Sequence, residues 1–122
     1  MTRSVRSIAF ATLAFLAVAG SARANRVDLM TSDGPMRIEI SRNGEVDGAY
    51  PDHDGVMRGR INASGDIRGI WTQPTSDQPC REVRGGTKAW GTFYIAGIYT
   101  RRPMGLWGYC GAEPNHDWKM QR

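Results

Sequence analysis

Hydrophobic and polar residues alternate with a period of two through three segments of the chain. The segments span residues 44–50, 55–61 and 65–71, and each begins with Gly, has a second Gly at its fifth place and ends in a bulky residue. Side chains alternate across a β-strand, so the third, fifth and seventh positions of each segment share one face. That face is predicted to lie in the core, and it carries Val46, Gly48, Tyr50, Met57, Gly59, Ile61, Ile67, Gly69 and Trp71.

The opposite face of these strands is charged, which is typical of a face in contact with solvent. In an antiparallel arrangement, Asp47 lies opposite Arg58 and Glu45 lies opposite Arg60. Exposed cross-strand pairs of this kind contribute only about 0.2–1 kcal/mol, but they help to fix the register of the strands.

Turn residues separate the predicted strands. Asn43-Gly44 is a strong two-residue hairpin signal between strands at 36–42 and 45–50. Two further strands are predicted at 90–95 and 104–109, and no window has the 3.6-residue period of an amphipathic helix.

Short loops of this kind connect neighbouring antiparallel strands. The predicted fold is therefore all-β: a single small antiparallel meander, arranged as a closed or partly open up-and-down barrel. Short outer strands at 27–30 and 118–120 are expected to meet and close the sheet.

The glycines in the middle of the strands need a physical cause, because Gly weakens a strand. One cause is a bulky group lying over Gly48, Gly59 and Gly69, for which Trp90 and Trp107 are the candidates. The other is the sharp bending of a small barrel.

The first 24 residues have the three-part layout of a secretory signal peptide. Arg3 and Arg6 precede an apolar run at 8–18, and small residues at Ala22 and Ala24 mark a cleavage site. A membrane anchor is the alternative, but a bilayer requires about 20 apolar residues. We therefore expect a signal peptide at 1–24 and a single all-β domain at 25–122, with no transmembrane anchor after cleavage. The mature protein is expected in the periplasm or outside the cell.

Removal of the signal peptide changes the charge of the protein. The whole chain has a net charge of +4, but the mature part keeps 13 basic and 12 acidic residues, a net charge of +1. A nucleic-acid-binding domain usually carries a clear basic excess. The composition therefore argues against nucleic acid as a partner.

Cys80 and Cys110 are the two cysteines of the chain. In an exported small domain, an even number of cysteines predicts a disulfide. A redox-active pair is the alternative, but such pairs usually have the Cys-x-x-Cys spacing. The spacing here favours a structural bridge.

The mature chain resembles a group of short secreted bacterial proteins built from a Gly-rich β-meander, over roughly residues 36–118. The resemblance rests on the runs Gly44–Tyr50 and Gly65–Trp71 and on the later motifs around Trp90-Gly91 and Trp107-Gly108. The group supports the fold class and implies no catalytic residues. The meander is also similar in style to avidin-like and lipocalin-like barrels, whose ligand-contacting residues have no match in this sequence.

The chain is rich in aromatic residues, with four Trp and four Tyr. Trp is favoured where apolar area meets a polar partner, which indicates a cleft for a sugar ring or an apolar ligand. The alternative is that these side chains form the core, which we favour for Trp71 and Trp107. Trp118 follows three polar residues and is expected to be exposed. The candidate ligand-binding residues are Tyr50, Trp71, Trp90, Trp107 and Trp118.

Asp52-His53-Asp54-Gly55 is the densest cluster of ligating side chains and resembles half of a calcium loop. The third oxygen ligand and the terminal Glu are missing. We therefore favour a solvated turn in which Gly55 takes a positive φ, and predict no metal or other cofactor.

Catalysis has little support in the sequence. His116-Asp117 offers a base and an orienting carboxylate, but no nucleophile is identifiable nearby. Arg101-Arg102, with Arg81, Arg84 and Lys88, offers a basic patch for acidic glycans, but we favour a charged loop surface as the explanation of these residues.

Two functions from different classes remain. The first is a non-catalytic binding module of the cell envelope, for a glycan or an apolar ligand. The second is a structural or protein-interaction module without a pocket, which binds another envelope protein.

Overall fold

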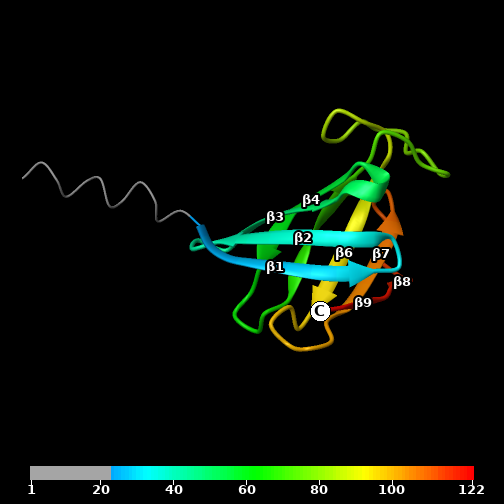
Figure 1. Cartoon of the computed structure of the whole chain (residues 1–122). Helices are drawn as coiled ribbons and strands as arrows, with labels where there is room; N and C mark the ends of the chain where they lie inside the picture. Colours follow the sequence, from blue (N-terminus) through cyan, green and yellow to red (C-terminus); the bar gives the residue numbers. More distant parts are fainter. Residues whose placement is uncertain (1–22) are drawn as a thin grey trace, which may run out of the picture.

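A computed structural model describes residues 23–122, and in this part of the chain nine antiparallel strands form one sheet (Figure 1). The predicted signal peptide lies outside the described residues except for Arg23 and Ala24, which begin the first strand. In residues 23–122 no helix has the length and apolarity needed to cross a membrane. The elements are β1 (Arg23–Thr31), β2 (Gly34–Ser41), β3 (Glu45–Tyr50), the 3-10 helix η1 (Pro51–His53), β4 (Gly55–Ile61), β5 (Ile67–Thr72), β6 (Trp90–Ala96), β7 (Met104–Tyr109), β8 (His116–Trp118) and β9 (Met120–Gln121).

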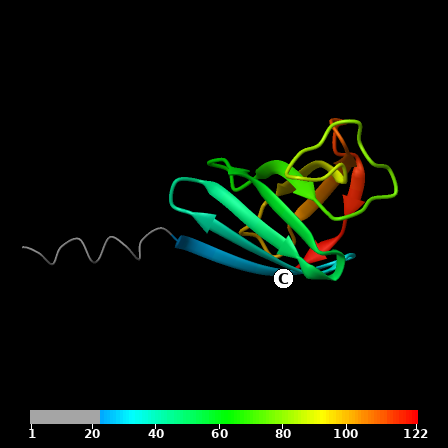
Figure 2. The same cartoon turned by 90° about the horizontal axis from the view of Figure 1, so that it is seen from above.

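The sheet is a meander that curls into a nearly closed barrel with one seam (Figure 2). Each strand from β1 to β7 pairs with the next strand in the sequence. The chain then continues past Lys119 into β9, which pairs with β1 through Met30–Gln121 and Thr31–Met120. The carbonyl of Lys119 also accepts a hydrogen bond of 2.9 Å from Ser32 N–H. The predicted meeting of the first and last strands is confirmed.

The register of the central strands is as predicted from the alternation. Asp47 lies opposite Arg58 and Glu45 opposite Arg60. Asp47 and Arg58 form an exposed ion pair at 3.4 Å, whereas Arg60 donates to the carbonyl of Asn43 instead. The large side chains of the predicted inner face are buried, except that of Ile61, which is half-buried. With the inner residues of the other strands they form one core that includes Ile38, Val46, Met57, Ile67, Trp71, Phe93 and Ile95.

Two turns differ in detail from their prediction. The hairpin at Asn43-Gly44 has three residues between the strands, because β2 ends at Ser41, and Gly44 takes a φ of +88°. The prediction that Gly55 takes a positive φ is wrong, because Asp54 does so instead, with φ +50°. Gly55 is required for another reason: a Cβ there would lie 2.0 Å from the ring of Tyr50.

The prediction that Trp90 or Trp107 lies over the glycines inside the strands is wrong, and the groups next to these glycines are a methionine and the backbone of the neighbouring strand. A Cβ on Gly48 would lie 2.6 Å from the methyl group of Met57. Gly59 and Gly69 face each other across β4 and β5, and a Cβ on either would strike a backbone carbonyl at 2.0–2.2 Å, as expected in a sharply bent sheet. Trp90 and Trp107 are not among the nearest groups to these glycines.

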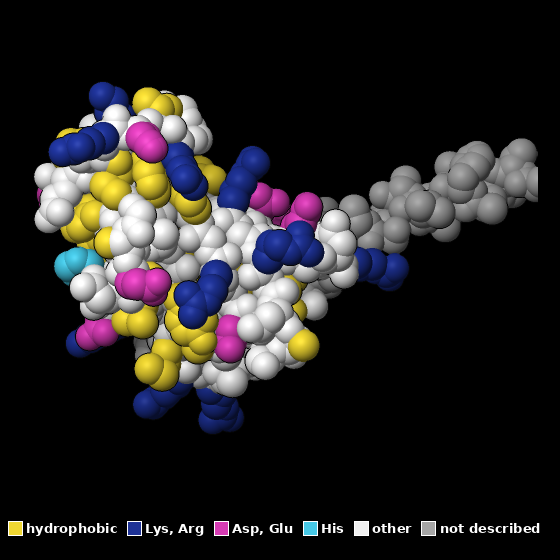
Figure 3. All heavy atoms as spheres, turned by 180° about the vertical axis from the view of Figure 1, so that it is seen from behind, with side chains coloured by type: hydrophobic (Ala, Val, Ile, Leu, Met, Phe, Trp, Pro, Cys, Tyr) yellow, Lys and Arg dark blue, Asp and Glu magenta, His cyan; other side chains and the backbone are white. Residues whose placement is uncertain are grey.

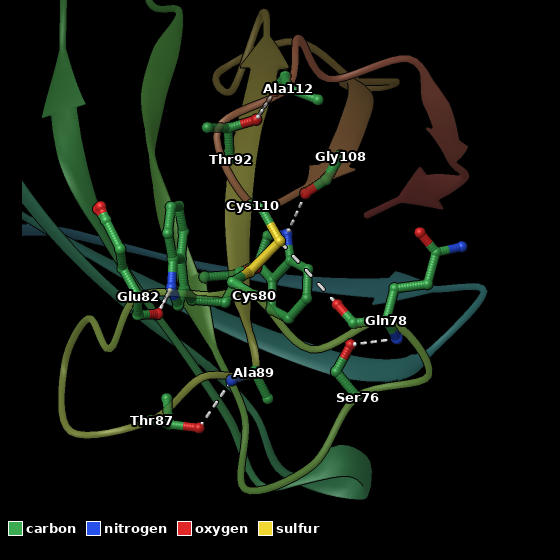
Figure 4. The surroundings of a disulfide bond; sticks show 12 residues. Ser76, Gln78, Cys80, Glu82, Thr87, Ala89, Thr92, Gly108, Cys110 and Ala112 are labelled. Atoms are coloured by element: carbon green, nitrogen blue, oxygen red, sulfur yellow. Dashed lines mark hydrogen bonds between the residues drawn. A yellow bond between two sulfur atoms is a disulfide. The ribbon is translucent and has the colours of Figure 1, made fainter.

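Cys80 and Cys110 form the predicted disulfide, with their Cα atoms 5.6 Å apart. Cys80 belongs to the long loop of residues 73–89 between β5 and β6, and Cys110 directly follows β7. Figure 4 shows Ser76 and Gln78 of this loop on one side of the bond and Glu82 on the other. The disulfide therefore ties a loop without strand structure to the barrel wall.

Gly91→Ala is expected to destabilise the fold by at least about 2 kcal/mol, because overpacking a filled interior forces the backbone and side chains apart. A Cβ at this position would lie 1.9 Å from the carbonyl of Gly108 and 2.6 Å from the indole of Trp71. Urea denaturation measures the change. Gly111→Ala is the control, since a Cβ there meets nothing within 4 Å. A loss at Gly91 no larger than that of the control would contradict the packing.

Replacing both Cys80 and Cys110 by Ser is expected to lower the free energy of unfolding by roughly 3–4 kcal/mol, because the bridge closes a loop of about 30 residues in the unfolded chain. Equilibrium denaturation of the variant and of the oxidised protein measures the difference. Reduction of the unmodified protein should reproduce it. A difference below about 1 kcal/mol would show that the bridge stabilises the fold far less than its loop length indicates.

Candidate functional site

A cavity of about 490 Å³ opens at one end of the barrel. The turn between β1 and β2, helix η1 and the loop 73–89 meet at this end, at the right of Figure 1. An up-and-down meander places alternate connections at the same end, so these segments converge although they are far apart in the sequence. The cavity is lined by Asp33, Tyr50, His53, Trp71, Gln73, Thr75, Ser76, Asp77, Trp107, Tyr109 and Trp118.

Aromatic rings make up most of the apolar wall, in two groups. Tyr50 of β3 and Trp118 of β8 meet edge to face, with ring centroids 5.4 Å apart. In the second group, the rings of Trp71, Trp107 and Tyr109 are all within 6.2 Å of one another, also edge to face. Edge-to-face packing is a preferred geometry for aromatic pairs, and it holds these rings in fixed positions around the cavity.

Four of the five predicted ligand-binding residues therefore lie around one cavity. Trp71 is buried and donates from its indole Nε1 to the carbonyl of Gly108 at 3.1 Å. Trp107 is half-buried and lines the cavity, so it is both a core residue and part of the wall. Tyr50 and Trp118 complete the set.

The expectation that Trp118 is exposed is wrong. Its exposed fraction is 3%, because its side chain points into the barrel, where its ring packs against that of Tyr50. The polar residues before it, which suggested exposure, lie at the rim and on the outer face. The indole N–H of Trp118 is buried and has no hydrogen-bond acceptor within residues 23–122.

Trp90 lies away from the cavity. Its indole N–H donates to the carbonyl of Glu82 at 2.8 Å, and the guanidinium of Arg84 lies 4.8 Å from its ring centroid. Both partners belong to the loop 73–89. Trp90 thus anchors this loop to the barrel.

A polar rim completes the site. Asp33 pairs with His53 across the mouth, with 3.3 Å between the carboxylate and Nε2, and both side chains are more than one-third exposed. The hydroxyl of Tyr50 donates to Gln73 Oε1 at 2.9 Å, and Gln73 Nε2 donates to the carbonyl of Thr75. Burial, and to a lesser degree the carboxylate of Asp33, raises the pKa of the Tyr50 hydroxyl. This hydroxyl therefore stays protonated and connects the loop to the barrel.

The metal candidates do not assemble into a site. Asp52 packs against Gly34, and Asp54 is the residue with positive φ after η1. In the part of the chain that the structure describes, no three His, Cys, Asp or Glu side chains are grouped as metal ligands. His53, the third candidate, pairs with Asp33 of another turn.

The residues considered for catalysis are also apart. His116 stacks on Trp107 with ring centroids 4.4 Å apart, and Asp117, the next residue on β8, faces the other side of the strand. Ser76 lies at the cavity near the Asp33–His53 pair, but its hydroxyl accepts a hydrogen bond from Gln78 N–H. Within residues 23–122, no hydroxyl group is hydrogen-bonded to His53.

The proposed basic patch is divided between the two ends of the barrel. Arg81, Arg84 and Lys88 precede β6, whereas Arg101 and Arg102 follow it. Since β6 runs the length of the barrel, these five residues do not form one surface.

Sequence reasoning missed Asp33, Gln73, Asp77 and Tyr109 as cavity residues. Asp33 and Asp77 are in loops with no distinctive motif, and the sequence does not distinguish Tyr109 from the other aromatic residues. The order of the strands could have indicated these residues, because the turns at 32–33 and 51–54 and the loop 73–89 must lie at the same end of a meander.

Comparison of the chain with protein-family models, curated proteins and solved structures found no match. The interpretation of the site therefore rests on its own geometry.

Tyr50→Phe is expected to lower the free energy of unfolding by about 1 kcal/mol at neutral pH, because it removes the hydrogen bond to Gln73. The substitution should also change the pH dependence of the free energy of unfolding. In the unfolded chain the Tyr50 hydroxyl ionises near pH 10, whereas in the folded protein it ionises only at a higher pH. The unmodified protein therefore loses stability as pH rises above about 10, by up to about 1.4 kcal/mol per pH unit.

Urea denaturation between pH 8 and 11.5 measures this contribution. Tyr50→Phe should lack it, whereas Tyr99→Phe, at an exposed position, should keep it. Identical alkaline profiles for Tyr50→Phe and the unmodified protein would contradict the assigned burial of the hydroxyl.

Proposed function

We propose that this protein is an exported, non-catalytic binding module that holds a small ring-containing molecule at the mouth of its barrel. The observation that carries the proposal is the open cavity lined by Trp71, Trp107 and Trp118, three of the four tryptophans. A sugar ring or an apolar ring is the ligand that such walls bind best, since both stack on aromatic side chains.

The size of the cavity supports a small-molecule ligand. Ligand pockets in proteins typically have volumes of about 300–1,000 Å³ and combine apolar walls with a few polar groups. The cavity of about 490 Å³ lies within this range, and Asp33, Gln73 and Ser76 provide polar groups at its rim. Such groups would orient the hydroxyl or amide groups of a bound ligand.

Export is supported by two independent features. The N-terminal 24 residues have the layout of a signal peptide, and the Cys80–Cys110 disulfide is typical of an oxidising compartment. A periplasmic or secreted location fits both.

The alternative function, a protein-interaction module, predicts a filled barrel and an apolar patch on its outer surface. The open cavity argues against it. The large exposed apolar side chains are Met30, Val56, Val83, Tyr99 and Met104, and they belong to five different segments of the chain.

Nuclear magnetic resonance of the indole N–H groups tests the proposal. The ¹⁵N-labelled protein, with its disulfide intact, is titrated with methyl β-glucoside, diacetylchitobiose and indole. At least one of these probes is expected to shift the signals of Trp71, Trp107 and Trp118, because their rings line the cavity. The signal of Trp90 should stay in place and serves as an internal control.

Trp107→Ala provides the matched test, because Trp107 lines the cavity but is only half-buried. It should weaken binding of the active probe about tenfold, and Tyr99→Phe, at an exposed position outside the cavity lining, should leave the affinity unchanged. Shifts confined to Trp90, or no shift with any ring-containing probe, would overturn the proposed function.

A further inference from the structure

The charges at the cavity differ from those on the rest of the protein. Apart from Tyr50 and Tyr109, the ionisable residues that line it are Asp33, His53 and Asp77, and neither Lys nor Arg is among the lining residues. The mature part of the chain has 13 Lys and Arg against 12 Asp and Glu. Figure 3 shows Lys and Arg side chains spread over the outer face of the barrel, between acidic and apolar side chains. The mouth is therefore an acidic site on a protein whose mature part is close to neutral.

Asp33 lines the cavity together with the aromatic residues. It lies close enough to the Tyr50 hydroxyl to contribute to the raised pKa of that group, and it contacts His53 at 3.3 Å. The contact with His53 is exposed, and exposed pairs of this kind contribute little to stability. Asp33 is therefore able to interact with a bound group without a large loss of fold stability.

The aromatic rings of the cavity differ from two other rings of this protein, which have an Arg guanidinium group lying over them. Within residues 23–122, guanidinium groups lie over two rings: Arg68 is 4.5 Å from the centroid of Tyr94, and Arg84 is 4.8 Å from that of Trp90. Neither ring lines the cavity. None of the five aromatic residues that do line it has a guanidinium group over it, although the faces of Trp and Tyr rings attract positive charge, and the imidazole of His116 stacks on one of them, Trp107.

We propose that the ligand of this cavity carries a positively charged nitrogen, as a primary or quaternary ammonium group on an apolar or sugar framework. The half-buried rings of Trp107 and Tyr109 would contact the ammonium group, and Asp33 and Asp77 would supply the opposite charge at the rim. This inference rests on the proposed function, and it specifies the chemical class of the ligand. It also explains why no Lys or Arg lines the cavity, since such a side chain would compete with the ligand for the rings.

Matched pairs of probes that differ in charge test the inference. Choline is compared with 3,3-dimethylbutan-1-ol, its neutral carbon analogue, and tryptamine is compared with tryptophol. The indole signals of Trp71, Trp107 and Trp118 report binding in the ¹⁵N-labelled protein. Each cation is expected to bind at least tenfold more tightly than its neutral partner at low salt.

Asp33→Asn separates charge from shape. It should weaken the binding of the cationic probes about three- to tenfold and leave the neutral probes unchanged. Asp117→Asn is the control, because Asp117 is an exposed acidic residue outside the cavity lining. It should change neither affinity.

The outcomes distinguish failure of the ammonium inference from failure of the proposed binding function. If neutral probes bind as tightly as their cationic partners, or if Asp33→Asn affects both equally, the ammonium inference is overturned and the binding function stands. If the glycan and indole probes bind but the cations do not, the inference is likewise overturned. If no probe of either set shifts the three signals, both the function and the inference fail.

Discussion

The structure depends on closure of the sheet by the last few residues of the chain. β8 pairs with β7, and only Lys119 separates it from β9, which pairs with β1. One short segment therefore covers both edges of the meander, and unpaired edges of this kind would otherwise be open to pairing with other chains. Closure also carries Trp118 into the interior, where its ring meets Tyr50. The segment that pairs with both edges of the meander thus also supplies part of the cavity wall, through Trp118.

Small residues inside the barrel make room for the large ones. The ring of Tyr50 lies over Gly55, and the indole of Trp71 lies over Gly91. A barrel of this size is filled by inward-facing side chains, so each large ring requires a neighbour without a side chain. The glycines thus set the positions of the rings, and the rings set the shape of the cavity. The price in strand stability is offset by burial of the aromatic surface.

The remaining wall is built differently. Residues 73–77 belong to a loop without strands, and several contacts hold it: the disulfide at Cys80, the packing of Arg84 on Trp90, the hydrogen bond from Trp90 to Glu82, and the hydrogen bond from Tyr50 to Gln73. The first of these is covalent. A wall held at several points can present Gln73, Ser76 and Asp77 to a ligand at low conformational cost. The acidic residues at the rim and the half-buried rings of Trp107 and Tyr109 are the groups on which the proposed recognition of an ammonium group rests.

The period-two alternation was sufficient to predict the all-β meander, the inner face and the strand register, because side-chain direction in a strand follows directly from position. The disulfide followed from composition and the predicted compartment. The cavity was predictable only as a set of aromatic residues. Its location, the burial of Trp118, the separation of Trp90 and the role of Asp33 depend on how the barrel closes and how the turns meet at one end. These are contacts between residues far apart in the chain, and local pattern carries no information about them, so the tertiary structure alone decided them.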